Sequence, residues 1–147
     1  MFGWFKRFFP IPGSAAGARG AAGELLAAEY LRRKRGFSVV VRNWRSARDR
    51  RAELDLVCRD GEVLVFVEVK TRTAGARVPG YYAVNARKKR ALRRACESYL
   101  AQLAVRPRTY RLDVVEVALP APAAPAGAVP EVRHFENIAL FSRHDRG

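Results

Sequence analysis

The chain of 147 residues has few cysteines, few histidines and few acidic residues. Its two cysteines, Cys58 and Cys96, cannot build a dense disulfide framework, and no secretory signal precedes them, so we expect buried thiols in a cytoplasmic protein. The two histidines, His134 and His144, lack the spacing of a metal site or of a catalytic triad. These shortages argue against a secreted disulfide scaffold and against chemistry based on histidine.

No apolar run is long enough to predict a transmembrane helix. The opening segment MFGWFKRFFPIPG is apolar and aromatic, but Lys6, Arg7 and Pro10 interrupt it, so we expect no stable membrane insertion. We expect a flexible N-terminal tail over residues 1–19, with a weak interfacial anchor or a partner-docking segment as alternatives. Because no repeat, second domain or glycine-rich phosphate loop is visible, one domain over 20–141 and a C-terminal tail over 142–147 remain.

Basic residues are present in excess. The chain has 28 lysines and arginines against 14 acidic residues, which gives a formal charge of +14 and an isoelectric point near 11.0. A charge of this sign favours a polyanionic partner. Nucleic acid, with DNA first, is therefore the leading candidate, and an anionic membrane or the ribosome are the alternatives. Since 49% of the residues are hydrophobic, we expect a folded core.

Hydrophobic periodicity and turn residues predict helices and strands in a mixed order. Asp60-Gly61 is a strong signal for a two-residue hairpin loop between two of the strands. The expected elements are a helix over Ala21–Arg35, a strand over Phe37–Arg42, two strands in AELDLVCRDGEVLVFVEVK, a helix after Asn85 and strands over Thr109–Val117 and Glu131–Leu140. This order predicts an α/β fold, with a mixed sheet flanked by helices.

The expected hairpin fixes which side chains share a face. With Asp60-Gly61 as the loop, Arg59 opposes Glu62, and counting outward places Asp55 opposite Phe66 and Glu53 opposite Glu68. One face then carries the polar residues Glu53, Asp55, Glu68 and Lys70. The other face carries Leu54, Leu56, Val65, Val67 and Val69.

Converging carboxylates need a compensating charge. Asp55 and Glu68 would repel each other if they were buried together without one. Mg²⁺ accepts a few carboxylate oxygens together with water and phosphate oxygens, so it suits two acids with open positions. Lys70 on the same face could hold an attacking water or stabilise charge on a phosphorus-bound oxygen. The alternative is that Glu68 and Lys70 form a salt bridge near the strand end.

A third acid, Glu24, lies in the first predicted helix. It precedes Ala27, Ala28 and Leu31 by three, four and seven residues, so it shares their inward face. The other interpretation is a first-turn acid that complements the helix dipole. Periodicity leaves both open.

The ordered set GELLAAEYL, AELDLV, VFVEVKTR, AVNARKK and YRLDVV resembles a known family. Asp55 followed by Glu68-Val69-Lys70 is similar to the signature of the restriction-endonuclease-like, or PD-(D/E)XK, nuclease superfamily. The whole set, over Gly20 to Phe141, resembles the YraN-like family of bacterial proteins, which are predicted endonucleases. Ala52 stands where that family has glycine, and Leu112 where an aromatic residue is common.

The resemblance implies a restriction-endonuclease-like αβββαβ core and a set of residue roles. Asp55, Glu68 and the main-chain carbonyl of Val69 would bind Mg²⁺ or Mn²⁺, and Lys70 would act on the water. Glu24 would complete the acidic cluster, as in junction resolvases, which work as dimers. The resemblance also implies that Lys88 opens the long helix towards the substrate and that Arg111 and Asp113 support the strand beside the site.

The sequence thus predicts a metal-dependent nuclease that hydrolyses phosphodiester bonds in DNA, branched or structured DNA included. The basic residues nearest the expected metal in the chain are the candidates for phosphate contact, namely Arg72, Arg77, Lys88 and Lys89. A homodimer is the expected assembly by analogy with resolvases. The alternatives are a catalytically silent nucleic-acid-binding protein of nuclease fold and an RNA-processing or ribosome-associated factor.

Overall fold

The computed structural model describes residues 15–75 and 86–140. Five strands form one sheet in the order β1-β2-β3-β4-β5, in which β3 and β4 are parallel and the other neighbours antiparallel. The elements are α2 (Ala15–Arg35), β1 (Ser38–Arg45), β2 (Glu53–Asp60), β3 (Val63–Thr73), α3 (Ala86–Gln102), β4 (Tyr110–Leu119) and β5 (Glu131–Ile138). This arrangement confirms the α/β fold with a mixed sheet flanked by helices.

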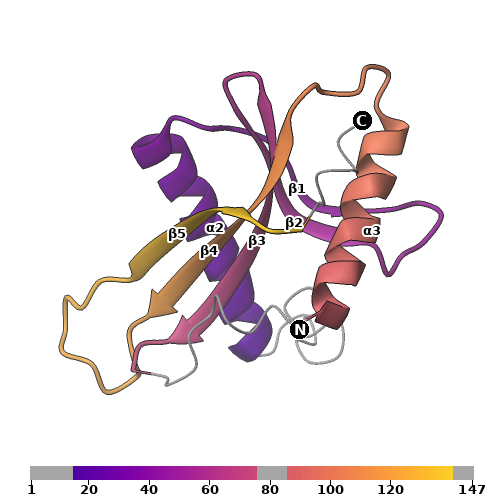
Figure 1. Ribbon diagram of the computed structural model, residues 1–147. Helices are drawn as coiled ribbons and strands as arrows, with labels where there is room; N and C mark the ends of the chain where they lie inside the picture. Colours follow the sequence, from indigo (N-terminus) through magenta and orange to yellow (C-terminus); the bar gives the residue numbers. More distant parts are fainter. Residues whose placement is uncertain (1–14, 76–85, 141–147) are drawn as a thin grey trace.

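Strict alternation along β3 gives the sheet two apolar faces. Leu64 and Phe66 pack in a cluster with α3, whereas Val65, Val67 and Val69 pack in a second cluster with α2. We call these the α3 face and the α2 face. A strand that is apolar on both sides needs a helix over each of them, and Figure 1 shows α2 and α3 on opposite sides of the sheet.

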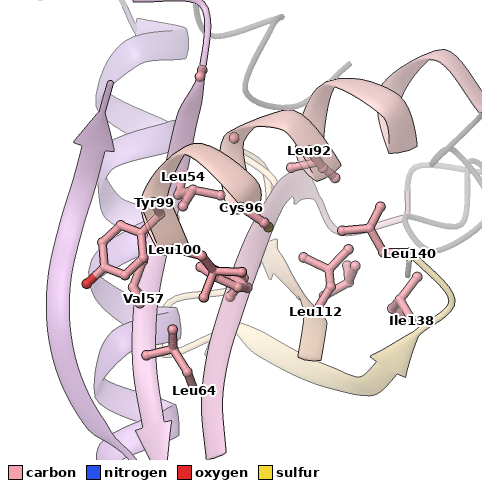
Figure 2. Packing of buried hydrophobic residues seen from close by; sticks show 14 residues of the cluster. Leu54, Val57, Leu64, Leu92, Cys96, Tyr99, Leu100, Leu112, Ile138 and Leu140 are labelled. Carbon is pink, nitrogen blue, oxygen red and sulfur yellow. The ribbon is translucent and has the colours of Figure 1, made fainter. Parts of the chain in front are cut away.

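Helix α3 covers the sheet with one apolar stripe (Figure 2). The stripe recurs at helical spacing and consists of Leu92, Ala95, Cys96, Tyr99 and Leu100. The Tyr99 ring meets Trp44 of β1 and Phe66 of β3 edge to face, with centroids 5.2 and 5.8 Å apart. These aromatic contacts therefore fix α3 against β1 and β3 on the α3 face.

Helix α2 begins at Ala15, six residues before the predicted start and inside the segment expected to be a flexible tail. It ends before Gly36, whose φ of 71° is favourable for glycine at a helix C-terminus, as predicted. Because the helix starts early, its first turn contains no acidic residue. Glu24 is therefore not a first-turn acid, and the dipole interpretation of this residue is wrong.

The hairpin between β2 and β3 differs in register from the prediction. Asp60 pairs with Val63 and Arg59 with Leu64, so the loop is Gly61-Glu62 and not Asp60-Gly61. Gly61 has a φ of 57°, and a glycine at the first loop position is typical of type II′ hairpins. The shift moves every partner by two residues, so the expected pairing of Asp55 with Phe66 is wrong.

Alternation along β2 also breaks where none was predicted. Leu54 and Val57, three residues apart, both belong to the α3-face cluster, whereas Leu56 belongs to the α2-face cluster. The expectation that Leu54 and Leu56 share a face is therefore wrong. The break occurs opposite Asn43 of β1, whose positive φ of 52° marks a matching irregularity in the neighbouring strand.

The close approach of α2 to β3 yields a test of the packing. A Cβ on Gly23 would lie 1.8 Å from Oγ1 of Thr71, so Gly23→Ala must push the helix from the strand. Glycine to alanine inside a helix usually stabilises by about 0.5–1 kcal/mol. Here we expect a loss of about 1–3 kcal/mol in the free energy of unfolding, measured by urea denaturation.

Leu25→Ala, on the exposed side of the same helix, serves as the control for this substitution. It should change stability by less than about 0.5 kcal/mol. A Gly23→Ala protein more stable than wild type would contradict the described contact.

Candidate functional site

Glu68 and Lys70 are buried side chains on the α3 face of β3. They alternate with Val67 and Val69, which belong to the α2 face, and they are 2% and 6% exposed. In the parallel register, Lys70 stands beside Glu116 of β4, which is also buried. The prediction that Glu68 and Lys70 share a face is confirmed, and the structure adds Glu116 to them.

Asp55 lies where the ladder between β2 and β3 ends. The last recorded pair is Leu56 with Val67, and the next residue outward on β2 is Asp55. Its Oδ2 accepts a hydrogen bond of 2.8 Å from the main-chain N–H of Val69. The carboxylate of Asp55 thus replaces a main-chain acceptor on β2. It bonds to Val69, the residue between Glu68 and Lys70.

The main chain of Val69 presents a further oxygen on the same side. In an extended strand the N–H and C=O of one residue point towards the same neighbouring strand. Since the N–H of Val69 points to Asp55, its carbonyl also faces β2. Two carboxylates and one carbonyl, the donor set that the sequence motif implies, are therefore contributed by adjacent parts of β2 and β3.

Lys88 of α3 compensates the charge of Glu68. Its Nζ lies 2.9 Å from Oε1 of Glu68, and both side chains are 2% exposed. We expected Lys88 to be available to phosphate, but the structure buries it against the acid. The alternative interpretation paired Glu68 with Lys70, whereas the ion pair of Glu68 described here is with Lys88.

The lysine of the motif is perturbed by its surroundings. Burial lowers the pKa of Lys70 below its ordinary value of 10.5, and the positive charge of Lys88 lowers it further. Glu116 opposes this shift, Arg72 adds to it, and Glu68 again opposes it. A lysine of this kind is easier to deprotonate than one in water, which is a property of proton-transferring lysines.

A divalent ion fits these donors as an open site and not as an all-protein cage. Among the described residues, no group of three or more acidic, histidine or cysteine side chains could hold a metal. Glu24 is 8% exposed, next to the contact of Gly23 with β3, but it does not join Asp55 and Glu68 in such a group. Two carboxylates with a carbonyl leave the open positions that Mg²⁺ prefers.

The residues expected to contact phosphate are distributed unevenly. Arg72 is an ion-pair partner of Glu116, and both line a cavity of about 260 Å³. Lys89 is half-buried next to Lys88, and Arg77 lies outside the described residues. Lys70 is the register partner of Glu116, so it lies beside one of the residues that line this cavity.

Glu53 lies at the other border of the site. It forms an ion pair of 3.2 Å with Arg45 and lines a small cavity of about 40 Å³ together with Asp55. Its predicted pairing with Glu68 is wrong, because the register moves by two residues. Glu53 nevertheless lies beside Asp55, as a supporting residue would.

Arg111 and Asp113 form a separate network. Asp113 belongs to the alternation of Val115 and Val117 and is therefore on the α2 face, opposite Glu68 and Lys70. It bonds to Arg111 at 2.9 Å, to Nε2 of His134 at 2.8 Å and to the N–H of Asn137 at 2.9 Å. These residues support β4 and β5, but from the side away from the site.

Sequence reasoning missed Glu116 and the interaction of His134 with Asp113. Glu116 interrupts the apolar run VVEVAL in the same way that Glu68 interrupts VFVEV, and that signal could have identified it. No spacing rule connects His134 to Asp113, because they meet only through the register of β4 with β5.

Comparisons with known proteins give a consistent result. A family model described as "Uncharacterised protein family UPF0102" matches residues 23–117. A UPF0102 protein of Geobacter metallireducens is 37% identical over 118 residues, covering 80% of this chain and 88% of the relative. A UPF0102 protein of Symbiobacterium thermophilum is 50% identical over 100 residues (67% and 80%), and one of Streptomyces coelicolor is 41% identical over 127 residues (86% and 92%).

The Asp113 network leads to a prediction about acid stability. Burial raises the pKa of Asp113, but hydrogen bonds from His134, Arg111 and Asn137 and the charge of Arg111 outweigh it, so the pKa is below 3.8. A carboxyl with a lowered pKa stabilises the fold above its unfolded pKa and ceases to do so as the pH falls through the folded pKa. Asp113→Asn should cost about 2–4 kcal/mol near pH 7 and progressively less below pH 3.8, measured by denaturant titration.

The control is Asp60→Asn, which alters the exposed acid bonded to the same Arg111. It should cost less than about 1 kcal/mol, as exposed ion pairs do. Equal losses for both variants, or a loss for Asp113→Asn that does not depend on pH, would contradict this account.

Proposed function

The chain belongs to family UPF0102, the YraN-like family that its motifs indicated, and we propose that it is a metal-dependent nuclease that hydrolyses phosphodiester bonds in DNA. The observation that supports this most directly is the hydrogen bond from the N–H of Val69 to Asp55. It brings the buried carboxylate of Asp55 to Val69, the residue of β3 that Glu68 and Lys70 flank.

In the proposed mechanism, Asp55, Glu68 and the carbonyl of Val69 would hold a Mg²⁺ or Mn²⁺ ion. When bound there, such an ion supplies Lewis-acid stabilisation for charge that develops on the phosphoryl oxygens. Oxygen donors of this kind suit hard divalent cations, and Asp55 and Glu68 are pre-positioned because both are buried in the sheet. The protein thereby supplies a fixed place for the reacting phosphate.

Lys70 handles the proton in this proposal. Burial and the neighbouring positive charges lower the pKa of its ammonium, so Nζ can hold the attacking water and accept its proton. Glu116, beside it in the register and paired with Arg72, keeps the local charge from becoming wholly positive. The water oxygen attacks phosphorus, the bond from phosphorus to the leaving sugar oxygen breaks, and that oxygen takes up a proton from the Lys70 ammonium or from solvent.

Positive charge near the site favours a nucleic-acid substrate. The first turns of α3, which carry Lys88 to the site, also carry Arg87 and Arg90 with exposed side chains. Together with the net charge of +14, they favour contact with a phosphate backbone. Branched or structured DNA, and a homodimer that acts on it, are the narrower form of this proposal, taken from the similarity to resolvases.

A catalytically silent nucleic-acid-binding protein is the second candidate. It is favoured by the ion pair between Lys88 and Glu68, which neutralises one of the two acids with a residue of the chain itself. It is also favoured by the lack of a three-acid metal group among the described residues. The two candidates differ in turnover and agree on the nucleic-acid surface.

Asp55→Asn separates enzyme from binder. The amide retains an oxygen for the N–H of Val69 but removes the charge, so the fold should persist. We expect Mg²⁺- or Mn²⁺-dependent DNA cleavage to fall by about 10²-fold or more, because a metal ligand is lost. Binding of the same DNA should change by less than about threefold, since backbone contacts dominate affinity. Gel-based cleavage and fluorescence anisotropy measure the two quantities.

Glu97→Gln is the matched control, since Glu97 is an exposed acid on α3 paired with Arg93. It should cleave at the wild-type rate. Cleavage that continues in EDTA, or Asp55→Asn at full activity, would rule out the proposed site. Metal-dependent cleavage absent from the wild-type protein, with tight binding retained, would favour the silent binder.

The substrate class can be tested by competition at one fixed salt concentration, because affinity for any polyanion changes with salt. A labelled four-way DNA junction should be displaced by unlabelled junction at a concentration about tenfold lower than by linear duplex or single strands. If structured RNA competed best, the RNA-processing alternative would replace the DNA substrate. Equal competition by all would contradict structure-specific recognition.

A further inference from the structure

We propose that Lys88 is a built-in counter-cation of the acidic site, whose ammonium holds Glu68 until a divalent cation competes for the same carboxylate. This inference rests on the proposed function, because it concerns the metal that the nuclease would use. It assigns to Lys88 a positioning role through Glu68, distinct from the phosphate contact expected from the sequence.

The first step is the burial of the pair. Nζ of Lys88 and Oε1 of Glu68 are 2.9 Å apart, and each side chain is 2% exposed. An isolated carboxylate at this depth would lose most of its hydration, so it requires a positive partner. Lys88 of α3 supplies that partner.

The second step is the position of Lys88 in its helix. It is the third residue of α3, and the first turn of this helix contains no acidic residue. The N-terminal end of a helix carries partial positive charge, so an ammonium there is unfavourable for the helix itself. Lys88 is therefore poorly explained by helix stability, and its described ion pair is with Glu68 of β3.

The third step is the crowding of positive charge. Lys70, buried two residues from Glu68 on the same face of β3, adds a second ammonium to this part of the site. A divalent ion bound by Glu68 would share that carboxylate with the ammonium of Lys88, whose Nζ lies 2.9 Å from Oε1. Two cations that share one buried carboxylate repel each other, so Lys88 must weaken metal binding or shift away.

Lys88→Met tests the competition, because methionine fills similar volume without charge. Mn²⁺ is titrated into the full chain without nucleic acid, and binding is measured by isothermal calorimetry. We expect Lys88→Met to bind Mn²⁺ roughly tenfold more tightly than wild type, because the repulsion is removed. Its melting temperature should be lower than that of wild type without Mn²⁺ and should rise more when Mn²⁺ is added.

Arg94→Met is the matched control, because Arg94 is an exposed cation further along the same helix. It should bind Mn²⁺ like wild type. If Lys88→Met bound Mn²⁺ with wild-type affinity or more weakly, the counter-cation role would be overturned while the nuclease proposal remained. If neither protein bound Mn²⁺ and neither cleaved DNA, both proposals would fail.

A measurement on the wild-type protein covers the case in which Lys88→Met does not fold. The Nζ signal of a buried, paired lysine can be followed by ¹⁵N NMR during a titration with Mg²⁺. We expect the signal of Lys88 to shift or broaden as the site fills. An unchanged signal at Mg²⁺ concentrations that saturate the protein would overturn the inference, whereas metal binding with the expected shift but no cleavage would leave it standing and reject the nuclease.

Discussion

The early end of the β2–β3 ladder is the constraint on which the site depends. Beyond the pair Leu56 and Val67 the two strands no longer exchange recorded pairs, although β3 continues to Thr73. A buried N–H at that point needs an acceptor, and Asp55 provides it. The carboxylate is thereby fixed beside Glu68 by the hydrogen-bonding needs of the main chain. The same bond that completes the sheet also creates a pair of neighbouring buried acids.

Those acids make charge balance the second constraint. Glu68 and Glu116 on the α3 face are accompanied by Lys70, Lys88 and Arg72, so acids and bases alternate across β3, β4 and the start of α3. Each charge is tolerable because an opposite one lies close to it. The addition or removal of one cation therefore affects several neighbours, which makes this face sensitive to its ionic partners and suited to a reaction on a charged phosphate.

The sequence predicted the element order and the alternation of β3 well, because a strand apolar on both faces leaves a strong pattern at Val65, Val67 and Val69. It failed at the hairpin, where Asp60-Gly61 and Gly61-Glu62 are both acceptable loops and the choice depends on the φ of Gly61. The grouping of polar residues on β3 survived this error, because a shift of two residues preserves the face. The pairing of Lys88 with Glu68 could not be predicted, since it depends on how α3 docks.

The two faces of the sheet separate a structural network from the proposed site. On the α2 face, Asp113 is bonded to Arg111, His134 and the N–H of Asn137, contacts that join β4 to β5 and leave no access for a substrate. On the α3 face, Lys70 lies beside Glu116, which lines a cavity of about 260 Å³. Because β4 carries Asp113 and Glu116 only three residues apart, a shift of that strand would disturb both. The buried Asp113 network and the β3–β4 ladder that places Glu116 beside Lys70 therefore depend on the same strand.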